Sequence, residues 1–68
     1  MSAVNPFPYR YAHHKSPAGT GRWTFSPGDG AGHIYVEVKL VVSGTSYREA
    51  CRQAKKKLGG YPEVYLLP

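Results

Sequence analysis

Cysteine is almost absent from this chain, which carries a single one, Cys51. One cysteine excludes an internal disulfide and any zinc site built from several cysteines, the usual means of stabilising small secreted domains. Stability must therefore come from core packing or from association between chains. Sixty-eight residues allow one core, and an apolar fraction of 41% indicates a folded chain rather than a disordered one.

Acidic residues are also scarce, with four Asp and Glu against nine Lys and Arg. The formal net charge of +5 favours anionic partners such as nucleic acid or an acidic protein face. Asp29 lies in a predicted turn, Glu49 at a predicted helix start, and Glu37 and Glu63 on predicted strands, so the spacing suggests no catalytic carboxylate pair. The sequence therefore predicts a binding protein rather than an enzyme.

Metal-ligand spacing is missing as well. His13 and His14 are adjacent, while His33 and Cys51 stand alone, which is not the arrangement of a zinc site. Cys51 lies on a predicted apolar helix stripe, where cysteine usually behaves as a small buried hydrophobe. We expect no metal and no cofactor.

Long hydrophobic runs do not occur. No stretch approaches the roughly 20 apolar residues that span a bilayer. The first six residues lack the basic start and apolar run of a signal peptide. The expected location is the cytoplasm, with no membrane partner.

Helix and strand breakers are dense over residues 1–21, which contain three prolines and two glycines. This density predicts an extended N-terminal arm preceding a single α+β domain over residues 22–68. Within the arm, Tyr9, Tyr11 and His13 alternate with more polar or smaller residues. The alternation predicts a short edge strand over residues 9–14.

Two further strands are predicted at residues 22–26 and 33–42. Trp23 and Phe25 share one face of the first by its two-residue period, and apolar residues alternate through the second. Residues 27–32 between them are rich in glycine and other turn-forming residues, which predicts a β-hairpin. Because a strand rather than a helix follows these glycines, the segment is interpreted as a turn and not as a phosphate-binding loop.

A helix is predicted over residues 47–58, after a short break at residues 43–45. Ser46 and Glu49 match a capping box, in which each side chain accepts a hydrogen bond from the other residue's amide. The apolar stripe that follows the helical period comprises Tyr47, Ala50, Cys51, Ala54 and Leu58. Two glycines end the helix, and a final strand is predicted over residues 63–67.

These elements predict an α+β fold: a small antiparallel or mixed sheet of three to four strands with one amphipathic helix packed on one face. The last strand could pair with residues 33–42 or with residues 22–26, and the pattern does not decide between them.

Basic residues on the predicted helix form a stripe, because Arg48, Arg52 and Lys55 are spaced at i, i+4 and i+7, with Lys56 beside them. The stripe could bind phosphates or could simply keep an amphipathic helix solvated. In the N-terminal segment aromatic and basic residues interleave, as in stacking platforms for single strands and in protein hot spots. The predicted partner-binding residues are Tyr9, Arg10, Tyr11, His13, His14, Lys15, Arg22, Tyr35, Lys39, Arg48, Arg52, Lys55 and Lys56.

Two family resemblances bear on function. Residues 33–38, 46–50 and 54–58 resemble the last strands and helix of a double-stranded-RNA-binding domain. The small size and the Ala-containing helix at residues 48–54 are similar in style to small phage-encoded inhibitors of the anti-CRISPR type. The second resemblance implies a protein of the host cell cytoplasm that plugs a nucleic-acid channel or holds an effector complex inactive.

The leading functional hypothesis is a non-enzymatic protein that inhibits or modulates a larger nucleic-acid-handling complex through a basic and aromatic surface. Its partner would be a larger protein or ribonucleoprotein complex. One alternative is a module that contacts nucleic-acid phosphates directly. Another is a structural or oligomerising subunit that associates through exposed strand edges.

Overall fold

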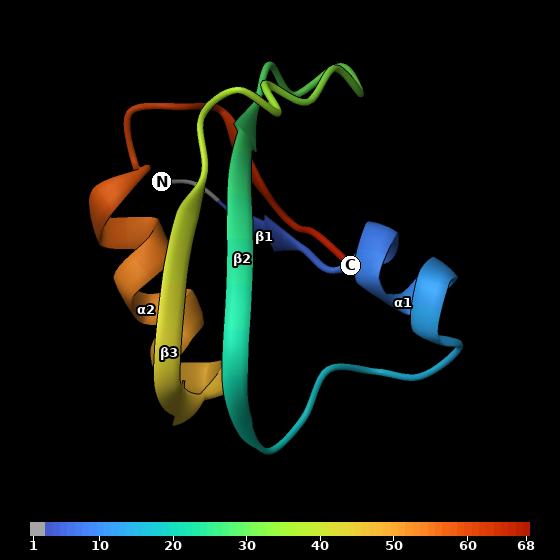
Figure 1. The fold of residues 1–68 in the computed structure, drawn as a ribbon. Coiled ribbons are helices and arrows are strands. Elements are labelled where there is room, and N and C mark those ends of the chain that lie inside the picture. Colours follow the sequence, from blue (N-terminus) through green and yellow to red (C-terminus); the bar gives the residue numbers. More distant parts are fainter. Residues whose placement is uncertain (1–2) are drawn as a thin grey trace.

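The computed structural model of the protein describes residues 3–68, which form two helices and a four-stranded mixed sheet (Figure 1). This confirms the predicted α+β class. The elements along the chain are β1 (Ala3–Asn5), α1 (Phe7–His13), β2 (Thr20–Gly28), β3 (Leu40–Ser46), α2 (Tyr47–Lys57) and β4 (Glu63–Leu66).

The strand order across the sheet is β1-β4-β2-β3. β2 pairs antiparallel with both β3 and β4, whereas β1 pairs parallel with β4. Phe25 on β2 lies opposite Leu40 of β3 and Leu66 of β4, so it occupies the centre of the sheet. The final strand therefore pairs with the strand that contains residues 22–26, which settles the alternative left open by the sequence.

The core lies between the sheet and α2, which covers one side of it (Figure 1). Ala50 and Ala54 are fully buried, and their small side chains allow the helix backbone to approach the sheet closely. Opposite them the sheet presents larger residues. The buried core residues from the strands are Trp23, Phe25, Val42, Val64 and Leu66.

The N-terminal segment differs from the predicted arm. Residues 1 and 2 lie outside the described residues, residues 3–5 form β1 within the sheet, and residues 7–13 form α1. The predicted edge strand over residues 9–14 is therefore wrong. Pro8 lies in the first turn of α1, where a missing N–H costs nothing, and residues 7 and 11 or 9 and 13 also have helical i, i+4 spacing.

The predicted strand over residues 33–42 is wrong in its first half. β3 begins at Leu40, and residues 33–39 form a loop that meets β2 at one isolated bridge between Gly28 and Ile34. Val38 N donates to Tyr35 O at 3.0 Å, which closes a turn inside the alternating run. Val36 is 55% exposed, so the alternation in this stretch does not correspond to a buried sheet face.

Strand boundaries also shift around the two predicted turns. β2 continues through Pro27 and Gly28, because these residues pair with β4. The predicted break at residues 43–45 lies inside β3, where the pairing register slips between Gly21 and Trp23. Gly44 has a φ of 71°, so this break is a β-bulge rather than the end of a strand.

The predicted helix over residues 47–58 and the predicted final strand over residues 63–67 are confirmed, each one residue shorter. Leu58 is the C-cap of α2 and donates its N–H to Ala54 O at 2.8 Å. Among the described residues, neither helix has the length and apolar character needed to cross a bilayer.

Candidate functional site

The predicted partner-binding residues do not form one surface. Those from the N-terminal segment lie on α1 and the residues after it, and those from the helical stripe lie on α2, which is set apart from α1 (Figure 1). Arg22 is exposed on β2, and Tyr35 and Lys39 belong to the loop between β2 and β3. The molecule therefore presents separate basic surfaces.

The outer side of α2 is the more strongly charged surface. Arg48, Arg52, Lys55 and Lys56 are all exposed, and we call this group the α2 basic face. The first three line one shallow hollow together with half-buried Cys51. The structure thus places Arg48, Arg52 and Lys55 along one open surface of α2, which borders the core at Cys51.

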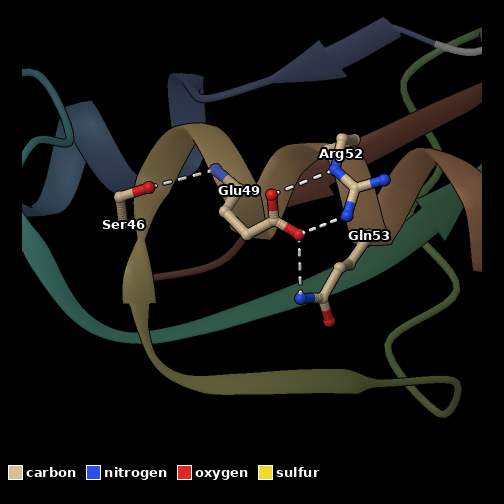
Figure 2. Close-up of polar contacts among 4 residues, drawn as sticks. All are labelled: Ser46, Glu49, Arg52 and Gln53. Atoms are coloured by element: carbon tan, nitrogen blue, oxygen red, sulfur yellow. Dashed lines mark hydrogen bonds and ion pairs between the residues drawn. The ribbon is translucent and has the colours of Figure 1, made fainter.

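Glu49 organises the first turns of α2 (Figure 2). Its carboxylate accepts two hydrogen bonds from Arg52, one from Nε at 3.0 Å and one from Nη2 at 2.6 Å. It accepts a third hydrogen bond from Gln53 Nε2 at 3.2 Å. The hydrogen bonds from Arg52 hold the pKa of Glu49 below its usual value. Arg52 is therefore partly neutralised within the protein, whereas Arg48 and Lys55 are the more available cations of the α2 basic face.

The capping box is half formed. Ser46 Oγ accepts a hydrogen bond from Glu49 N at 3.2 Å, as predicted, but the Glu49 side chain turns to Arg52 and Gln53 instead of reaching back to Ser46 (Figure 2). The guanidinium offers two N–H donors and a charge, which makes a stronger pairing than a single backbone N–H.

We expect Ser46→Ala to destabilise the protein by about 1 kcal/mol, because it removes the acceptor for an N-terminal amide of α2. Urea denaturation followed by circular dichroism measures the change. Ser46→Thr keeps the hydroxyl and should remain close to the wild type. Equal midpoints for the alanine and threonine variants would show that the cap does not stabilise this helix.

α1 carries two pairs of rings on different sides. Tyr9 and His13 stack with ring centroids 4.2 Å apart, and Tyr9 also contacts Trp23 of β2 at 5.8 Å. Phe7 and Tyr11 form a tilted pair at 5.9 Å and are 63% and 71% exposed. The first pair attaches the helix to the fold, and the second faces solvent.

A second shallow hollow surrounds the exposed ring pair. We call it the α1 aromatic hollow, and its lining residues are Phe7, Arg10, Tyr11, His14, Lys15 and Ser16. His14 ends α1 in the left-handed conformation, with φ 56°, and donates its N–H to Arg10 O at 2.8 Å. After this left-handed residue the chain leaves the helix, and Lys15 lines the same hollow as the two rings.

Phe7 is an exposed surface residue that was not among the predicted partner-binding residues. Its signal was the i, i+4 spacing to Tyr11, which an extended arm would not bring together. Conversely, Trp23 is only 5% exposed, and Tyr9 is half-buried against it. Neither ring is open enough to serve as the exposed stacking platform that the N-terminal pattern suggested.

The remaining predicted residues occupy other settings. Tyr35 is half-buried and contacts the rings of His33 at 5.0 Å and Tyr61 at 6.0 Å. Lys39 is exposed just before β3. Tyr35 therefore packs against His33 of its own loop and against Tyr61 of the segment between α2 and β4.

The metal-ligating side chains of residues 3–68 do not assemble into a metal site. No three of the His, Cys, Asp and Glu side chains there come close enough together to hold a metal ion. Cys51 lies beside Tyr47, whose hydroxyl pKa is raised by burial and by the neighbouring thiol.

Comparison of the chain with protein-family models, curated proteins and solved structures found no match. Function is therefore inferred from the surfaces described above.

Proposed function

We propose that this is a non-enzymatic binding protein of the cytoplasm that docks onto a larger nucleic-acid-handling complex and inhibits or modulates it. The α2 basic face is the docking element. Its partner surface would be acidic protein or the phosphates of a ribonucleoprotein. This way of working is the one implied by the resemblance of the chain to small phage-encoded inhibitors of the anti-CRISPR type.

The supporting observation is the division of α2 into a buried and a charged side. Ala50 and Ala54 are fully buried against the sheet, while Arg48, Arg52 and Lys55 are exposed and line one open hollow. Five of the nine Lys and Arg residues of the chain lie in this helix. Such a concentration of positive charge raises the rate and the selectivity with which the protein encounters an anionic surface.

Charge reversal tests the proposal most directly at Arg48→Glu with Lys55→Glu, because Arg52 is already paired with Glu49. We expect docking to weaken by about 2 kcal/mol or more if either cation is desolvated in the complex. Capture of partners from bacterial lysate by the tagged protein, with mass spectrometry, identifies the complex. Titration of the purified complex then measures the loss.

Arg48→Lys with Lys55→Arg is the matched control, since it keeps both charges and should keep the capture. Circular dichroism verifies that α2 is intact, because a glutamate in its last turn is unfavourable to the helix dipole. Nuclease treatment of the lysate separates the partner classes. Loss of all captured protein after nuclease would assign the contact to phosphates rather than to acidic protein. Undiminished docking of the charge-reversed variant would contradict the proposal.

A further inference from the structure

We infer that the α1 aromatic hollow is a second binding site, which takes a short segment of single-stranded nucleic acid. Its bases would stack on Phe7 and Tyr11, and its phosphates would contact Arg10 and Lys15. The site uses none of the residues of the α2 basic face, so it goes beyond the docking function proposed above.

The exposure of the two rings is the first observation. Phe7 and Tyr11 are 63% and 71% exposed, although the 68-residue chain has few large apolar side chains with which to build its core. Their rings lie side by side at 5.9 Å with an interplanar angle of 35°, so they offer neighbouring apolar surfaces. Stacking of bases on such rings tolerates any sequence, because every base has a flat face.

Charge around the rings is the second observation. Arg10, His14 and Lys15 line the same hollow. The first acidic residue of the chain is Asp29, so the segment that supplies these residues carries only positive side-chain charge. A ligand that fits both features presents flat apolar faces on an anionic backbone, which is the chemistry of an unpaired nucleic-acid strand.

The platform is held in place before any ligand arrives. Asn5 Oδ1 accepts a hydrogen bond from Phe7 N at 2.9 Å, and Asn5 Nδ2 donates to Glu63 Oε1 at 3.1 Å. On the inner side of α1, Tyr9 contacts Trp23 of the core. These contacts connect the helix to β4 and β2, so binding would require little ordering of the protein.

Fluorescence anisotropy of the purified protein with labelled oligo-dT of about ten nucleotides, within the range of site sizes for small domains, tests the inference. We expect Phe7→Leu with Tyr11→Leu to weaken binding at least about tenfold, because leucine is apolar but cannot stack as a ring does. Phe7→Tyr with Tyr11→Phe keeps both rings and should bind as the wild type does. Because leucine is a good helix former, α1 should persist, and circular dichroism checks this.

The salt dependence of the same titration tests the phosphate contacts. Arg10→Gln with Lys15→Gln should lower the slope of log K against log salt by about 1.4, at about 0.7 for each phosphate contact on a single strand. A duplex of matched length should bind more weakly, since its bases are already stacked. Absence of measurable oligonucleotide binding, wild-type affinity in the leucine pair, or equal affinity for duplex and single strand would each overturn the inference.

The leucine pair separates this inference from the docking proposal, because an oligonucleotide bound through its phosphates to the α2 basic face would not depend on Phe7 and Tyr11. The oligonucleotide titration contains no partner protein, and the leucine pair leaves every residue of the α2 basic face unchanged. A negative titration therefore removes the single-strand site while leaving docking through α2 to be judged by the capture experiment.

Discussion

Phe25→Ala should lower the free energy of unfolding by about 3 to 5 kcal/mol, the range typical of a buried phenylalanine truncated to alanine. Phe25 is 0% exposed and lies between Leu40 and Leu66 on the two neighbouring strands. A chain of this size has a total stability of roughly 3 to 10 kcal/mol. The substitution should therefore remove a large part of the total stability and lower the unfolding midpoint far below that of the wild type.

Urea denaturation followed by the fluorescence of Trp23 measures this effect, because Trp23 belongs to the same core cluster. Val41→Ala is the control. Val41 lies on β3 opposite Thr24 and is 45% exposed, so its truncation should cost much less than that of Phe25. A cooperative transition at the wild-type midpoint for Phe25→Ala would show that the core between α2 and the sheet is not as described.

Gly28→Ala should destabilise the protein by about 1 to 3 kcal/mol, the usual cost of overpacking a filled site. A Cβ at this position would collide with the ring of Tyr65 and would lie 2.7 Å from His33 O. Tyr65 is itself buried, and the His33 carbonyl accepts a hydrogen bond from Asp29 N. Neither neighbour can move without disturbing the junction between β2 and its loop.

Gly21→Ala is the matched control on the same strand, because a Cβ at position 21 meets nothing within 4 Å and the residue has no positive φ. It should change stability by no more than about 0.5 kcal/mol. Thermal denaturation of both variants gives the comparison. Equal melting temperatures would mean that Gly28 is not enclosed by Tyr65 and the His33 carbonyl in solution.

The helix α2 was predictable because several local signals agree there. Ser46 caps the helix, an apolar stripe includes Ala50 and Ala54, and two glycines follow Leu58. The strand around Trp23 and Phe25 was predictable for a similar reason, since both residues are large, apolar and separated by the period of a strand.

The alternating stretches were less decisive. Residues 9–13 satisfy both a two-residue period and an i, i+4 spacing, and in the structure they form a helix whose Tyr9 contacts Trp23. Residues 34–42 alternate without interruption, but β3 pairs with β2 only from Leu40 onward. Periodicity describes which side chains could share a face and does not say whether a partner strand lies alongside.

The candidate surfaces also combine features that the sequence indicated with features that depend on tertiary packing. The α2 stripe followed from sequence because a single helix fixes the relative positions of Arg48, Arg52 and Lys55. The pairing of Arg52 with Glu49 could have been expected from their i, i+3 spacing. The exposure of Phe7 and the burial of Trp23 could not, because each depends on which element packs against it.

By itself the sequence determined the fold class, the place of α2, the central apolar strand and the excess of positive charge, since these depend on local pattern and composition. Only the tertiary structure established the strand order, the helical state of residues 7–13 and the distribution of the basic residues over separate surfaces. Each of these depends on contacts between segments far apart in the chain. Such contacts are chosen by the packing of the whole core, which no local pattern encodes.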